Sequence, residues 1–129
     1  MFMLSTLFMA MTCDDSTTYY TDVTFVNKSE DTLFVAYGYD DVSPEVILVT
    51  QRRESLHRLL PNEELVAKVP ILTETDNEAL IRVFLIFKNS TMKKYSDEEL
   101  AEKNIYDKKL FFTYKELENK KFLVEYDGK

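Results

Sequence analysis

Cys13 and His57 are the side chains best suited to nucleophilic or metal chemistry, and each is the only residue of its type in the sequence. A catalytic cysteine needs a histidine within hydrogen-bond reach to accept its proton. His57, however, falls in a separate predicted β segment, between Leu56 and Arg58. One cysteine and one histidine also cannot complete a closed structural zinc site or an internal disulfide. The sequence therefore predicts no catalytic residue here, and we expect His57 to be a structural or surface imidazole.

The acidic residues could support calcium binding or glycoside hydrolysis. Asp40, Asp41 and Glu45 cluster in one predicted loop, but they lack the alternating aspartates, the glycine and the distal glutamate of a calcium-binding loop. A glycosidase needs two carboxylates across a cleft, and 23 acids can be paired in too many ways for spacing to select two. We expect solvated loop acids, and the sequence predicts neither a metal site nor a cofactor.

The eight tyrosines are a larger resource for binding, because each has a flat apolar face and a polar tip suited to sugars or proteins. We expect most of them in the core or on a sheet face. Tyr37 and Tyr39 stand two residues apart in a predicted strand beside the acidic loop, so they share one face of it. They are the candidate ligand-binding patch, with core packing as the alternative.

The elements that must position these residues begin with predicted strands. Alternating polar and apolar residues predict strands at 21–26 and 32–39, joined by the turn NKSED as a β-hairpin. The run EVILVT, residues 45–50, predicts a short buried strand, and Pro61-Asn62 predicts a turn between two more strands. Residues 71–80 predict a helical turn or a loop.

The second half of the chain contains the most apolar run and two helix signals. IRVFLIFK predicts a central strand at residues 82–88. Ser96 is followed three residues later by Glu99, and Thr113 by Glu116, which is the capping-box spacing of a helix start. The runs KKLFFT and KFLVEY predict further strands.

The predicted fold class is mainly β, a β-rich α+β domain at residues 21–127. We expect an antiparallel β-sandwich-like arrangement of seven short strands, with one or two short helices near the C-terminal third. A sheet with helices on one side is the alternative. The chain is long enough for a hydrophobic core, and 45% of its residues are hydrophobic.

Residues 1–12 predict a lipoprotein-type signal peptide. The uncharged apolar run from Phe2 to Met11 fits a signal-peptide apolar region and is shorter than the roughly 20 residues that span a bilayer. The residues AMTC that end at Cys13 are similar to a bacterial lipobox, in which the cysteine is acylated and becomes the mature N-terminus. DDSTT then makes residues 13–20 a hydrated, flexible tether. A buried first element with a free cysteine is the alternative.

The net charge of −7 repels phosphate backbones, and no cluster of Lys and Arg with interleaved aromatics offsets it, so nucleic acid is not an expected partner.

The order of motifs resembles small predicted lipoproteins of gut Bacteroides and their relatives over nearly the whole mature chain; the motifs are VTFVNKSEDTLFV, LLPNEELVAKV, IRVFLIFKNSTMKKYSDEELAEKNIYDKKLFFTYKEL and FLVEY. The resemblance implies an exported β-rich domain and supplies no active site. The stretch CDDST also resembles the tether that directs such lipoproteins to the outer surface. We therefore expect a chain lipid-anchored at the outer membrane, on its periplasmic or cell-surface side.

The expected function is that of a non-catalytic binding or interaction module, held to the membrane by a lipid on Cys13, with a glycan or a protein as ligand. One alternative is a structural or accessory subunit of a surface assembly, which an exposed unpaired edge strand would favour. A second is a hydrolase acting on envelope or dietary glycans. A pocket of convergent carboxylates with perturbed pKa values would favour that reading.

Overall fold

The computed structural model describes residues 20–38, 42–51, 53–70 and 80–129. The predictions made for Cys13, Tyr39, Asp40 and Asp41 lie outside these residues. So do those for the leader, for nearly all of the tether and for residues 71–79.

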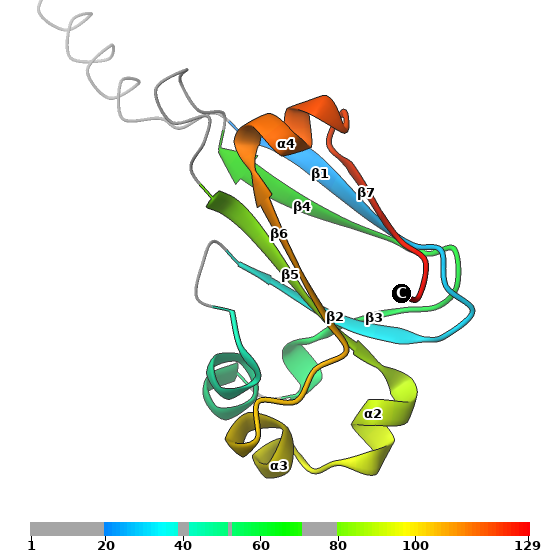
Figure 1. Cartoon of the computed structure of the whole chain (residues 1–129), viewed down its shortest axis with the longest axis vertical. Helices are drawn as coiled ribbons and strands as arrows, with labels where there is room; N and C mark the ends of the chain where they lie inside the picture. Colours follow the sequence, from blue (N-terminus) through cyan, green and yellow to red (C-terminus); the bar gives the residue numbers. More distant parts are fainter. Residues whose placement is uncertain (1–19, 39–41, 52, 71–79) are drawn as a thin grey trace, which may run out of the picture.

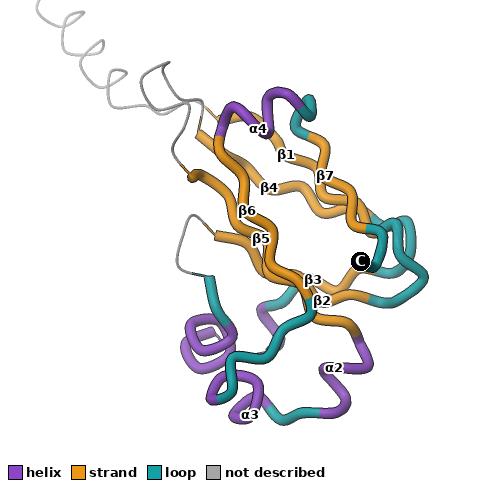
Figure 2. Tube along the Cα trace, viewed as in Figure 1, coloured by secondary structure: helices purple, strands orange, loops and turns teal. Residues whose placement is uncertain are grey.

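The described residues form two stacked sheets (Figure 1, Figure 2), which confirms the mainly β, sandwich-like fold class. Sheet A has the strand order β4-β1-β7, formed by Glu64–Pro70, Tyr20–Asn27 and Leu123–Tyr126. Sheet B has the order β3-β2-β5-β6, formed by His57–Leu59, Leu33–Gly38, Leu80–Lys88 and Lys108–Thr113.

Strand β5 lies between β2 and β6 and confirms the predicted central strand. Its successive side chains alternate between two cores. Phe84 and Ile86 pack between the two sheets, whereas Val83, Leu85 and Phe87 pack on the opposite face of sheet B. Burial on both faces is why the sequence of this strand is continuously apolar rather than alternating.

A layer of short helices covers the face of sheet B that points away from sheet A (Figure 1). It consists of η1 (Glu45–Gln51), η2 (Arg53–Ser55), α2 (Asn89–Lys94) and α3 (Asp97–Glu102). Ile47, Met92 and Leu100 pack from this layer onto the sheet. A further helix, α4 (Tyr114–Asn119), joins β6 to β7 and buries Leu117 in the core between the sheets.

Both predicted capping boxes are present. At the start of α3 the Ser96 hydroxyl accepts a hydrogen bond from the Glu99 amide at 3.2 Å, and the Glu99 carboxylate accepts one from the Ser96 amide at 3.0 Å. The Ser96 amide lowers the pKa of Glu99 from its ordinary value, because it stabilises the ionised carboxylate. Thr113 and Glu116 repeat the arrangement at α4, with distances of 3.1 and 2.8 Å.

The predicted hairpin between the first two strands is wrong, because β1 belongs to sheet A and β2 to sheet B. The buried Asn27 side chain explains why the chain passes from sheet A to sheet B after β1. Its amide donates to the carbonyls of Asp31 at 2.8 Å and Leu59 at 3.0 Å, and its oxygen accepts from the Ser29 amide and hydroxyl at 2.9 and 2.6 Å. These bonds hold an open turn that carries the chain from one sheet to the other.

The predicted strand at residues 45–50 is also wrong, since this segment is the helical element η1. The Ser43 hydroxyl accepts from the Val46 amide at 3.2 Å and the Ser43 carbonyl from the Ile47 amide at 3.0 Å. Ser43 therefore caps a helical turn that Pro44 can begin, because proline has no amide hydrogen to leave unpaired.

The sandwich also contains one feature that the antiparallel prediction lacked. Strand β7 lies parallel to β1, with Phe25 opposite Val124, whereas β4 pairs with β1 antiparallel. The turn between β3 and β4 is as predicted. Asn62 adopts a φ of 70° there, a conformation that asparagine tolerates.

Candidate functional site

Tyr37, from the predicted binding patch, lies half-buried in β2 at the edge of the core between the sheets. Its ring stacks on the His57 ring with 5.6 Å between centroids and also contacts Phe84 at 6.3 Å. The structure brings Tyr37 and His57 together because β2 and β3 are paired, with His57 opposite Val35. Packing accounts for much of the Tyr37 surface, and its role in binding stays a prediction.

Arg82 also contacts the Tyr37 ring, with its guanidinium carbon 5.0 Å from the ring centre. The side chain is only 2% exposed. Its Nη1 donates to the Gly38 carbonyl of sheet B at 3.2 Å, and its Nη2 donates to the Lys68 carbonyl of sheet A. Arg82 therefore links the two sheets, and its contacts are structural.

A small hollow beside Tyr37 is lined by Ala36, Tyr37, Ile47, Ser55 and His57. Its volume is about 270 Å³, slightly below the range of typical small-molecule sites, which begins at about 300 Å³. This hollow has room for a small ligand at most.

A larger hollow lies between α2 and the connection from α3 to β6. We call it the tyrosine groove, and it is lined by Ser90, Thr91, Lys94, Tyr95, Ile105, Tyr106 and Asp107. Its volume of about 430 Å³ falls within the usual range for ligand sites. A lysine ammonium group lies over each tyrosine ring. The Lys94 nitrogen is 5.3 Å from the centre of the Tyr95 ring, and the Lys109 nitrogen is 5.2 Å from the centre of the Tyr106 ring.

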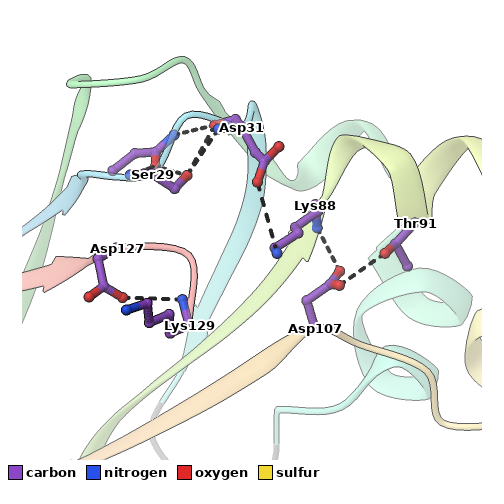
Figure 3. Close-up of polar contacts among 8 residues, drawn as sticks. Ser29, Asp31, Lys88, Thr91, Asp107, Asp127 and Lys129 are labelled. Carbon is purple, nitrogen blue, oxygen red and sulfur yellow. Dashed lines mark hydrogen bonds and ion pairs between the residues drawn. The ribbon is translucent and has the colours of Figure 1, made fainter.

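Asp107 fixes one wall of the groove (Figure 3). Its carboxylate accepts a hydrogen bond from the Lys88 amide at 2.7 Å and another from the Thr91 hydroxyl at 3.0 Å. Its own amide donates to the Ile86 carbonyl at 2.9 Å. One residue therefore ties the end of β5, the first turn of α2 and the start of β6 together.

Arg53 joins η2 to α2 and α3 within the helical layer. Its guanidinium donates to the Asp97 carboxylate at 2.6 Å, to the Met92 carbonyl at 2.7 Å and to the Tyr95 carbonyl at 3.1 Å. The last two bonds hold the backbone where α2 ends, up to Tyr95, which lines the groove. Sequence reasoning missed Arg53, because its partners lie 39 to 44 residues away along the chain.

Two further polar contacts are drawn in Figure 3, one from Lys88 at the end of β5 and one after the end of β7. The Lys88 ammonium lies 3.9 Å from the Asp31 carboxylate, and the Lys129 amide donates to Asp127 at 3.1 Å.

Burial raises the pKa of the Tyr126 phenol, and the nearby carboxylates of Asp107, Asp127 and Asp31 raise it further. Tyr126 is therefore a neutral hydroxyl at physiological pH rather than a general base.

An acidic hollow of about 430 Å³ is lined by Glu45, Glu98, Ala101 and Glu102. Glu45 belongs to the acidic loop considered for calcium. In the part of the chain that the structure describes, no group of three or more His, Cys, Asp or Glu side chains could hold a metal ion.

Strand β6 forms one edge of sheet B. Among the described strands it pairs only with β5. Phe111 on this strand is 53% exposed, and the Lys109 ammonium lies 5.9 Å from its ring.

No helix of the described ranges is both long and apolar enough to cross a membrane.

No family model, curated protein or solved structure matches the chain. The resemblance to Bacteroides lipoproteins therefore stays a prediction.

Proposed function

We propose that this protein is a non-catalytic binding module that holds its ligand in the tyrosine groove. The observation that carries the proposal is the groove itself, which joins two tyrosine rings and four polar side chains around about 430 Å³. Ligand sites are typically preformed hollows of this size with a few fixed polar groups. Bonds from Asp107 and Arg53 hold the groove backbone in place, which lowers the part of the entropy cost of binding that comes from ordering this backbone.

The proposal includes the cellular setting predicted from the leader. Cleavage before Cys13 and acylation of its thiol anchor the module at the outer membrane, on the periplasmic or cell-surface side. The apolar run that ends at Cys13 and the hydrated DDSTT segment after it support this setting. Mass spectrometry of the N-terminal peptide from native membranes tests it, together with membrane partitioning of a Cys13→Ala variant. An unmodified Cys13 in a chain that retains Met1 contradicts the anchor.

The binding role is tested by two-dimensional amide NMR of the full chain. Candidate ligands are uncharged oligosaccharides, amino acids, nucleosides and short peptides of either charge. We expect a ligand to shift amide signals of Thr91, Tyr95 and Tyr106 and to be recovered unchanged. Signals that shift only around Tyr37 and His57 would move the site to the other hollow. Conversion of the ligand to a product would identify an enzyme instead.

Among the described strands, β6 has one unpaired edge, and this edge favours a second candidate function, that of a subunit in a surface assembly. Unpaired edge strands are templates for pairing with another chain, and the exposed Phe111 ring adds apolar area to this edge. Sedimentation of the full chain over a range of concentrations tests this candidate, with Phe111→Lys as the comparison. Association that Phe111→Lys abolishes would support assembly, and a monomer at every concentration would exclude self-assembly through this edge.

A further inference from the structure

The side chains of the tyrosine groove restrict the chemistry of its ligand. Of the seven lining residues in the described part of the chain, Ile105 is the single purely apolar one. Ser90, Thr91, Lys94 and Asp107 supply hydroxyl, ammonium and carboxylate groups along its walls. An apolar ligand would cover these polar groups without hydrogen-bonding to them, at a cost in free energy. The ligand must therefore be rich in hydrogen-bonding groups.

The charges at the groove disfavour a strongly charged ligand. Among the described residues that line the groove, Lys94 is the one cation and Asp107 the one anion, so their charges balance. The whole chain carries a net charge of −7, which repels anions at longer range. A cationic ligand would meet Lys94 at the groove and Lys109 beside it, 5.2 Å from the Tyr106 ring. An uncharged polar ligand has neither penalty.

The tyrosines add a requirement for a flat, weakly polar surface. Tyr106 is 36% exposed and Tyr95 is half-buried, so each ring keeps some accessible surface at the groove. The face of a pyranose ring carries axial C–H groups that stack on an aromatic face, and its rim carries hydroxyls that donate and accept hydrogen bonds. Tyrosine suits this combination, because it stacks through its ring and hydrogen-bonds through its phenol.

The polar side chains of the groove can hydrogen-bond to the hydroxyl groups at the rim of a sugar ring. The Asp107 carboxylate accepts bonds from Lys88 and Thr91 and has further lone pairs for a sugar hydroxyl. The Lys94 ammonium lies over one face of the Tyr95 ring, 5.3 Å from its centre, and supplies a donor there, while the other face is the one for stacking. We infer that the ligand of the tyrosine groove is an uncharged saccharide, an inference that rests on the groove being the binding site proposed above.

The test is calorimetric titration of the full chain with defined oligosaccharides. The uncharged set contains tetramers of β-linked glucose, of mannose and of N-acetylglucosamine. The first two test neutral hexose polymers, and the third tests the amino sugar of envelope glycans. A galacturonic acid tetramer is the acidic comparison. We expect at least one uncharged tetramer to bind, and the acidic tetramer to bind more weakly or not at all.

The variants assign binding to the groove. Tyr106→Ala should weaken binding by about tenfold or more, the scale of losing one aromatic stacking face and its phenol. Asp107→Asn tests whether the charge of the Asp107 carboxylate contributes to the affinity for the saccharide. Tyr20→Ala is the matched control, because Tyr20 is 52% exposed on sheet A and does not line the groove, and it should leave affinity unchanged. Circular dichroism verifies that each variant is folded.

The outcomes separate the ligand class from the site. Tighter binding of the acidic tetramer, or equal affinity of wild type and Tyr106→Ala for the uncharged ones, overturns the inference. If no saccharide binds while a peptide or nucleoside shifts groove amides, the saccharide inference fails and the proposed function stands. If nothing in either panel perturbs the groove, both fail.

Discussion

Phe84 in the central strand offers the sharpest test of the fold that supports the groove. Its side chain is 0% exposed, and its ring lies 5.0 Å from that of Phe25 in the opposite sheet and 6.3 Å from those of Tyr37 and Phe112 in the adjacent strands. These neighbours are held by backbone pairing, so they cannot collapse into the space left by Phe84→Ala. We therefore expect Phe84→Ala to lower the free energy of unfolding by an amount near the upper end of the range of about 3–5 kcal/mol for such substitutions.

The assay is urea unfolding followed by far-ultraviolet circular dichroism, which suits a chain without tryptophan. With a slope near 2 kcal/mol per molar urea, a loss of about 4 kcal/mol lowers the midpoint by about 2 M. Phe84→Leu retains most of the apolar volume and should cost under about 1.5 kcal/mol, so it provides a folded variant if Phe84→Ala does not fold.

Two further substitutions decide whether both faces of β5 are buried. Leu85→Ala acts on the core beneath the helices and should cost about 2–5 kcal/mol, because Leu85 is also fully buried. Phe111→Ala is the control on the adjacent strand, where the exposed ring should contribute under about 1 kcal/mol. A loss under about 1 kcal/mol from either Phe84→Ala or Leu85→Ala would refute the three-layer arrangement.

Three further predictions concern polar side chains. Asn27→Ala should cost about 2–4 kcal/mol in urea unfolding, because it leaves several backbone groups of the buried turn without their partner. Arg53→Met should cost about 1–3 kcal/mol and weaken ligand binding through the Tyr95 backbone, and Arg53→Lys should not restore either, since it lacks the guanidinium fork. Tyr126 has a raised pKa in the folded state, so its contribution to stability is complete below its ordinary pKa of about 10 and is lost as pH rises through the folded-state pKa. The wild type should therefore lose stability relative to Tyr126→Phe as urea midpoints are taken above about pH 10.

Local signals in the sequence predicted the elements whose partners are close along the chain. Each capping box joins residues three positions apart, and both formed as predicted. The apolar run of β5 predicted a central strand, whereas burial of both its faces is a finding of the structure. Residues 45–50 show the limit of this reasoning, because a short apolar run fits a strand and a buried helical turn equally well. Ser43 and Pro44 were the available signal for the helix.

Long-range contacts decided the rest. The turn after β1 looks like a hairpin loop until the Asn27 amide is seen to bond the carbonyl of Leu59, 32 residues away. The tyrosine groove has the same origin, since the Asp107 carboxylate reaches Thr91 across 16 residues and Arg53 reaches Tyr95 across 42. No periodic pattern connects such residues, so Tyr95 and Tyr106 could not be distinguished in the sequence from the other tyrosines.

The tyrosine groove as a binding site is tested most directly by intermolecular nuclear Overhauser effects between the full chain and the uncharged oligosaccharide that binds it most tightly. Ring protons of Tyr95 and Tyr106 should show cross-peaks to the C–H protons of one sugar face, and these should disappear in the Tyr106→Ala variant. Cross-peaks from Tyr37 and His57 instead, or the absence of any contact with a groove residue, would contradict the account.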